Sequence, residues 1–121
     1  MKLIATVLVA FVAIEHVGFL VLEMFLWNTP WGRKRFGTTP EFAAESAALA
    51  ANQGLYNGFL AAGLAWGLWL SNDAHGVAIQ SFFLSCVAVA GIYGAATAKR
   101  SILFLQFVPA AIALAVLRLA A

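Results

Sequence analysis

Three ionisable side chains lie within one long apolar stretch near the beginning of the chain. They are Glu15, His16 and Glu23, and the residues around them are mostly Leu, Val, Ala and Phe. A helix turns by about 100° per residue, which would place all three within an arc of about 100°. Because ionisable groups are costly in hydrocarbon, this face should point into a protein interior. A carboxyl group beside an imidazole can transfer protons, so we predict that these three residues act in acid/base catalysis.

A second group of polar side chains lies in the following apolar stretch. Asn52 precedes Tyr56 by one helical turn, and Gln53 precedes Asn57 in the same way. Their amides and hydroxyl can donate and accept hydrogen bonds, which suits carboxyl and imidazole partners on a facing helix. We predict that these residues, together with Gln106, bind the substrate. The expected cavity lies between the membrane midplane and the cytoplasmic face and is lined by Glu15, His16, Glu23, Asn52, Gln53, Asn57 and Gln106.

Proline and glycine positions add to this expectation. Pro109 has no backbone N–H, so it should free the carbonyl of Leu105, one turn from Gln106. Gly54 and Gly58 form a G-x-x-x-G pattern on roughly the opposite side of the helix from the amides. Such a pattern predicts close helix packing, here within the bundle.

Each polar residue also has a purely structural interpretation. Glu23 could pair with Arg33 or Arg35, and Glu15 with His16 could form a neutral hydrogen-bonded core. The amides and Tyr56 could serve packing alone, since polar contacts between membrane helices contribute only about 0.6 kcal/mol on average. A metal site built from the two glutamates and the histidine is weak, because adjacent helical side chains point about 100° apart. We therefore predict no metal ion and no cofactor.

The composition requires a membrane around these stretches. Of the 121 residues, 7 are Lys or Arg and 5 are Asp or Glu, whereas 64% are hydrophobic. The mean hydropathy is +0.93. A soluble domain of this size has too much surface for so few charges, and disorder requires the opposite composition. The basic residues form no stripe that would follow nucleic acid, and the single Cys86 excludes an internal disulfide and a cysteine zinc site.

Four apolar stretches can cross, or nearly cross, about 30 Å of hydrocarbon as helices. They cover residues 3–27, 42–70, 76–98 and 102–120. Glu15 and His16 interrupt the first, which distinguishes it from a cleaved signal peptide. The connection over residues 28–40 is rich in proline, glycine and charge, so we expect a loop there. The sequence predicts an all-α, four-helix transmembrane bundle with up-down topology and short loops, a single integral membrane domain over residues 1–121.

The basic residues also predict an orientation. Two connections hold five of the seven, namely Arg33, Lys34, Arg35, Lys99 and Arg100. The positive-inside rule then places loops 28–41 and 99–101 in the cytoplasm and both termini outside the inner (plasma) membrane.

Two blocks of the sequence resemble a known family. The first is E-H-x-x-F-x-x-L-E-M-F-L-W from Glu15 to Trp27, and the second is N-Q-G-L-Y-N-G from Asn52 to Gly58. The chain resembles, over its whole length, a family of small bacterial integral membrane proteins catalogued as a domain of unknown function. The resemblance implies a four-span membrane protein and brings no established activity with it.

Three classes of function fit these observations. In the first, the cavity binds a hydrophobic, lipid-like small molecule or acts on it by acid/base chemistry. In the second, Glu15 serves a proton-coupled exporter that works as a dimer. In the third, the protein is a non-catalytic membrane scaffold subunit. We favour the first class, because an exporter of this size needs neither a histidine nor two amide pairs beside its glutamate. The expected partners are membrane lipids, a hydrophobic small molecule and a second copy in a homodimer, with no nucleic acid.

Overall fold

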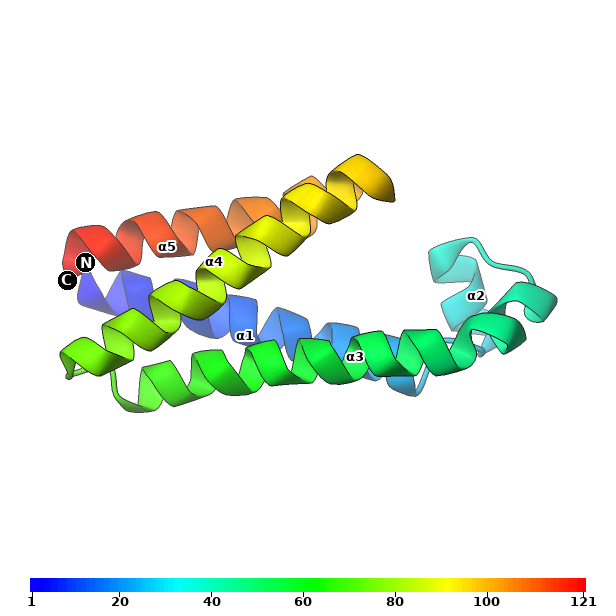
Figure 1. Cartoon of the computed structure of the whole chain (residues 1–121), viewed down its shortest axis with the longest axis horizontal. Coiled ribbons are helices and arrows are strands. Elements are labelled where there is room, and N and C mark those ends of the chain that lie inside the picture. Colours follow the sequence, from blue (N-terminus) through cyan, green and yellow to red (C-terminus); the bar gives the residue numbers. More distant parts are fainter. The chain divides into compact units, whose positions relative to one another are not determined.

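The computed structural model describes residues Met1–Ala121, and every regular element in it is helical (Figure 1). The elements, in chain order, are α1 (Lys2–Met24), α2 (Pro30–Phe36), α3 (Pro40–Trp69), α4 (Ala74–Thr97), the π-helical turn η1 (Leu103–Phe107) and α5 (Val108–Ala120). The chain contains no strand. The all-α fold class expected from the sequence is therefore confirmed.

Three segments, rather than the expected four, are long and apolar enough to cross a membrane. They are Lys2–Met24, Ala74–Thr97 and Leu103–Ala120, with mean hydropathies of 2.3, 1.8 and 2.0 in their most apolar windows. α3 has 30 residues and is the longest helix, but it is not among them. The amides of α3 and the two glutamates near its start lower its mean hydropathy. The expectation of a fourth span rested on helix length and aliphatic content and overlooked these residues. The three segments indicate a membrane protein.

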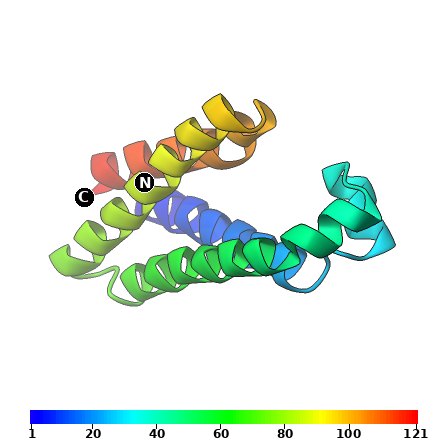
Figure 2. The ribbon, with the colours of Figure 1, turned by 45° about the vertical axis from the view of Figure 1, so that its right-hand side comes forward.

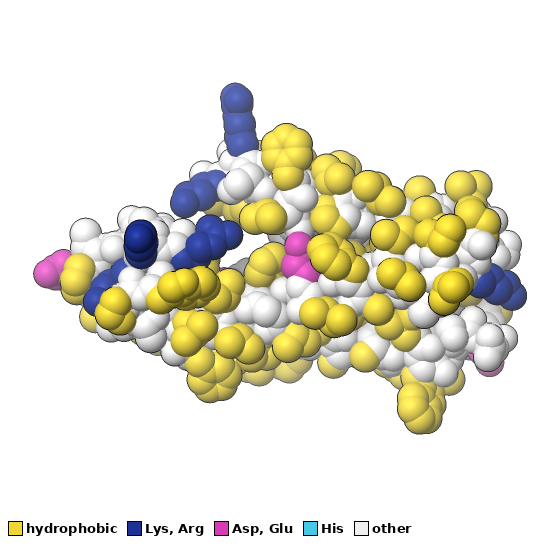
Figure 3. Space-filling model, turned by 180° about the vertical axis from the view of Figure 1, so that it is seen from behind, with side chains coloured by type: hydrophobic (Ala, Val, Ile, Leu, Met, Phe, Trp, Pro, Cys, Tyr) yellow, Lys and Arg dark blue, Asp and Glu magenta, His cyan; other side chains and the backbone are white.

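The exterior has the composition that such segments require. Large hydrophobic side chains are exposed along the apolar helices, among them Leu3 (74%), Ile14 (70%) and Phe104 (68%). Figure 3 shows a face on which hydrophobic side chains predominate and charged ones are few. In water this surface would be unfavourable, whereas lipid chains solvate it at no cost.

The chain folds into two compact units. One, the terminal unit, comprises Met1–Ile14 and Leu60–Ala121, and the other, the central unit, comprises Glu15–Phe59. α1 and α3 each contribute one part to both units. Most of the polar residues singled out above belong to the central unit, whereas Gln106 belongs to the terminal unit.

The terminal unit has an apolar core. Val9, Leu64, Leu84 and Val87 are fully buried in it, as are two alanines of α5. α4 packs along η1 and α5, and Figure 2 shows these helices from a second direction. Gly91 of α4 makes this approach possible, because a Cβ there would lie 2.6 Å from the backbone nitrogen of Phe107. Small residues thus set the distance between these helices, as is usual in membranes.

Pro109 accounts for the π-helical turn that precedes α5. It cannot donate a hydrogen bond to the carbonyl one turn earlier, and the helix widens over Leu103–Phe107. In this wider turn the N–H of Val108 donates to the carbonyl of Leu103. π-helical turns of this kind are frequent at functional sites.

The central unit contains a short helix that the sequence interpretation missed. Residues 28–40 were expected to form a loop, but Pro30–Phe36 is helical as α2. The hydroxyl of Thr29 accepts a hydrogen bond from the N–H of Gly32, and Gly37 ends the helix with a φ of 67°. These are ordinary capping signals, and proline is favoured in a first turn. The residues read as helix breakers are therefore the ones that begin and end this helix.

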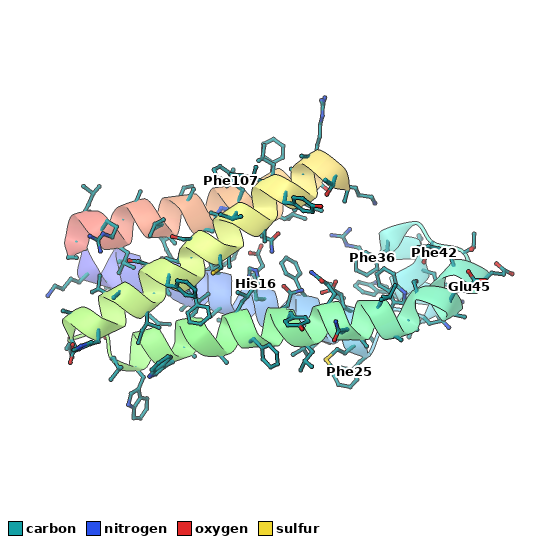
Figure 4. All side chains as sticks on the ribbon, viewed as in Figure 1. His16, Phe25, Phe36, Phe42, Glu45 and Phe107 are labelled. Atoms are coloured by element: carbon teal, nitrogen blue, oxygen red, sulfur yellow. The ribbon has the colours of Figure 1, made fainter.

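Trp27 anchors the region around α2. Its ring packs on Phe36 with centroids 4.9 Å apart, and its indole N–H donates to the hydroxyl of Ser46 at 3.0 Å. Figure 4 shows Phe36 and Phe42 near α2 and the start of α3. These contacts fix the position of α2 within the central unit.

Candidate functional site

His16 is completely buried in the middle part of α1 (Figure 4). Its ring meets Phe19, one turn further along the helix, edge-to-face with centroids 5.1 Å apart. An imidazole without access to water has a fixed orientation, and its two nitrogens differ in proton-donating and proton-accepting roles. The burial agrees with a residue that faces a protein interior and not lipid.

Glu15 has a carboxyl oxygen that is buried and has no hydrogen-bond partner. Its Oε1 is the only carboxyl oxygen among the buried side-chain atoms that lack a partner. The residue lies within a helix that is apolar enough to span a membrane. An unpartnered carboxyl oxygen in such a place costs free energy that a hydrogen-bond donor would recover. Glu15 therefore has a buried acceptor oxygen to which no group of this chain donates a hydrogen bond.

Glu23 is held by α3. The side-chain nitrogen of Asn57 donates to Glu23 Oε1 at 2.5 Å, and Asn57 is only 6% exposed. Arg33, considered above as a partner for Glu23, instead donates to the backbone and side-chain oxygens of Asn28. The structure therefore brings together one carboxyl–amide pair of the kind that the sequence predicted, between α1 and α3 of the central unit.

The other polar residues of α3 have a different environment. Asn52, Gln53 and Tyr56 are exposed, and Tyr56 meets the ring of Phe59 at 5.6 Å. The face of α3 that meets α1 is the one with the glycines, because a Cβ at Gly54 would lie 2.8 Å from Met24 Cγ.

Asn57 lies only about 60° from Gly54 on a helical wheel. It therefore takes part in the α1–α3 contact, whereas the other three residues do not. The glycine pattern already in the sequence was the signal for this face, since close approach requires small residues.

Gln106 lies on the π-helical turn of the terminal unit and is half-buried. A second amide, Gln80, is 2% exposed and donates from Nε2 to the carbonyl of Gly67 at 2.9 Å. The sequence interpretation did not select Gln80, although it is a lone amide within an apolar stretch. It joins α4 to α3 inside the terminal unit.

The structure brings no three His, Cys, Asp or Glu side chains close enough to hold a metal ion. The polar groups singled out in the central unit are proton donors and acceptors. Glu15, His16 and Glu23 supply ionisable groups, and Asn57 supplies an amide that positions one of them.

These features define the class of the protein. It is a small, all-helical membrane protein with carboxyl groups inside an apolar helix. Residues 10–118 match the family described as "Protein of unknown function (DUF1304)", and the chain belongs to this family. The expected resemblance to a domain of unknown function is thereby confirmed. No curated protein and no solved structure matches the chain.

Proposed function

We propose that the protein binds a hydrophobic, lipid-like small molecule within the membrane, and that Glu15 accepts a hydrogen bond from the polar group of that molecule. The observation that carries this proposal is the buried Oε1 of Glu15, which has no partner. A hydroxyl or amine on an otherwise apolar molecule supplies the missing donor. A soluble polar metabolite would first have to leave water, so a molecule already dissolved in the bilayer is favoured.

The neighbouring groups support an acid/base role in the same region. His16 follows Glu15 directly in α1 and is fully buried, which gives the proposed site a second ionisable group that can donate or accept a proton. Glu23 lies on α1, as Glu15 does, and it accepts a hydrogen bond from Asn57 of α3. In this proposal Glu15 receives the ligand, His16 takes or gives the proton, and the Glu23–Asn57 pair positions α1 against α3.

We also propose that α3 lies in the membrane as a fourth span, in spite of its lower hydropathy. In the central unit a Cβ at Gly58 would lie 2.6 Å from Leu20 Cδ1 of α1, and in the terminal unit one at Gly67 would lie 2.5 Å from Gln80 Cγ of α4. α1 and α4 are both candidate spans, so α3 shares their depth at each contact. Its 30 residues extend about 45 Å, which exceeds the hydrocarbon thickness.

The orientation proposal follows from this four-span arrangement. Loops 28–41 and 99–101 lie in the cytoplasm and both termini outside, in an inner membrane. Single cysteines at Lys34, Asn72 and Lys99, in a Cys86→Ser background, test it with a membrane-impermeant maleimide. Lys34 and Lys99 should be labelled from one side and Asn72 from the other. Labelling of Lys34 and Asn72 from the same side would exclude α3 as a span.

The binding proposal is tested by identifying the lipids that remain with the purified protein. Wild type, Glu15→Leu and Glu41→Gln are extracted in mild detergent, and their lipids are compared by mass spectrometry. Glu41 is an exposed carboxyl in the first turn of α3, so its variant controls for the loss of a charge. One non-bulk amphiphile should be retained by wild type and Glu41→Gln and be reduced about tenfold or more in Glu15→Leu.

Other outcomes favour the other two classes of function. If wild type carries only bulk phospholipid, and Glu15→Leu changes thermal stability alone, the scaffold role is supported. Proton release on binding of an organic cation, abolished in Glu15→Gln, supports the exporter. Either result would overturn the lipid-binding proposal.

A further inference from the structure

A pocket of about 440 Å³ lies in the terminal unit, at the end where α1 and α4 begin and α5 ends. Figures 1 and 2 show the two ends of the chain near each other in this unit. Residues of α1, α5 and the α3–α4 connection meet around the pocket, although they are far apart in the sequence. Three candidate spans begin or end here, and a bilayer crossed by these spans would have its headgroups at the level of the pocket.

Two basic side chains line this pocket without an acidic partner. Lys2 comes from the first turn of α1 and Arg118 from the last turn of α5. The only contact of ion-pair geometry in the structure joins Asp73 Oδ1 to the ring nitrogen Nδ1 of His75, at 2.8 Å. The same carboxyl oxygen caps α4 by accepting the N–H of His75 at 2.8 Å. Asp73, the one acidic side chain of the pocket, thus contacts His75, and neither Lys2 nor Arg118 has an ion-pair partner.

The rest of the lining is partly polar and partly apolar. Ser71 and Asn72 are exposed and offer side-chain donors, whereas Ala5, Val77 and Leu117 form apolar walls. Such a lining suits a ligand that carries an anionic group beside a hydrocarbon portion. A free inorganic anion would use the cations but leave the apolar walls without a partner.

We infer that this pocket binds the phosphate headgroup of an anionic phospholipid. The phosphate lies between Lys2 and Arg118, the polar connection contacts the remainder of the headgroup, and the start of an acyl chain follows the apolar wall. Arg and Lys are the usual partners of phosphate oxygens. This site uses residues of the terminal unit only, and it is independent of the role proposed for Glu15.

The experiment compares lipid binding by native mass spectrometry in detergent. Wild type is offered an equimolar mixture of phosphatidylglycerol and phosphatidylcholine. The pocket variant is Lys2→Gln with Arg118→Gln. The control variant is Lys34→Gln with Lys99→Gln, which removes the same charge from two exposed residues outside the pocket. A parallel sample contains excess inorganic phosphate, with chloride at equal ionic strength as its reference.

Wild type and the control variant should prefer phosphatidylglycerol, and the pocket variant should lose that preference. The expected loss is about fivefold for each charge removed, the fold-change that corresponds to ~1 kcal/mol. Equal losses in the two variants, or no preference in wild type, would overturn the inference. Displacement of the lipid by inorganic phosphate would assign the pocket to a soluble anion and overturn the lipid assignment. Glu15→Leu should leave the preference unchanged, so this proposal and the one for Glu15 can fail separately.

Discussion

The two units of the protein bury different kinds of side chain. In the terminal unit the core is aliphatic, with Leu64, Leu84 and Val87 fully buried, and its one buried amide, Gln80, has a backbone partner. In the central unit a histidine is fully buried, and a carboxyl–amide hydrogen bond joins α1 to α3. The unpartnered carboxyl oxygen of Glu15 also belongs to the central unit.

The two kinds of buried side chain have different consequences for the stability of the protein. An aliphatic core needs no polar partner and is sufficient to hold helices together through close contact. Ionisable groups inside an apolar helix reduce stability unless they are satisfied, so their presence calls for a functional reason. On this basis the terminal unit provides most of the packing and the central unit provides the candidate site. Three measurements test that division, and a fourth tests a polar contact at the start of α4.

The largest expected effect is the loss of a fully buried side chain in the terminal unit. Leu84→Ala should lower the free energy of unfolding by about 2–3 kcal/mol, because it leaves a cavity that the packed helices cannot close. SDS-induced unfolding followed by circular dichroism measures the change. Val89→Ala on the same helix is the control, since Val89 is 67% exposed and should cost little. Similar losses in both variants would contradict an aliphatic core at Leu84.

The second effect concerns the contact between α4 and the π-helical turn. Gly91→Ala places a methyl group against the backbone of Phe107, and it should cost about 1–2 kcal/mol in the free energy of unfolding. The matched control is Gly18→Ala in α1, where a Cβ has no neighbour within 4 Å. Gly18→Ala should be neutral or slightly stabilising, because alanine is the better helix former. A neutral Gly91→Ala would show that the two helices are further apart.

The third effect examines the polar contact of the central unit. Asn57→Leu leaves Glu23 Oε1 without its donor and should cost about 1 kcal/mol, less than the loss of Leu84. Asn52→Leu is the control, since Asn52 is exposed on the same helix. A double-mutant cycle with Glu23→Leu isolates the interaction of the pair. If Asn57→Leu costs as much as Leu84→Ala, the division between the two units is wrong.

The smallest effect is a dependence on pH at the start of α4. The backbone N–H of His75, followed by its ring, holds the pKa of the Asp73 carboxyl below its usual value. A lowered folded-state pKa stabilises the protein above the unfolded-state pKa, about 3.9 for Asp, and this contribution is lost as the pH falls through the folded-state value. Thermal unfolding of wild type and Asp73→Asn should therefore differ most near neutral pH, and the difference should shrink below about pH 4. A difference that is constant with pH would contradict the hydrogen bonds seen at Asp73.

The sequence was a good guide to the elements and a poorer guide to their contacts. The four long helices, with η1 and α5 taken together as the fourth, were expected within a few residues of their observed bounds, since hydrophobic length and the capping residues are local properties. α2 was missed because Pro30 and Gly37 were taken as helix breakers, although they occupy the two positions that begin and end a short helix. Helix length and aliphatic content also overstated the number of clearly apolar spans, because the amides and glutamates of α3 lower its hydropathy.

The candidate site was predicted in part. The pairing of a glutamate on α1 with an amide on α3 was expected in kind, and Glu23 with Asn57 is such a pair. The wheel led us to expect that the polar face of α3 meets α1, but the glycine face does so, and of the four polar residues only Asn57 reaches α1. Close approach decides between them, and only the glycine face allows it.

The sequence by itself determined that the chain is helical, that it belongs in a membrane and that Glu15 and Glu23 are the carboxyl groups within its apolar helices. These properties depend on composition and on spacing along one helix. Tertiary structure alone decided that Asn57 reaches Glu23, that Glu15 Oε1 stays without a partner, and that Lys2 and Arg118 share one pocket. The physical reason is that each of these facts depends on the distance between helices, which packing sets and which no single helix contains.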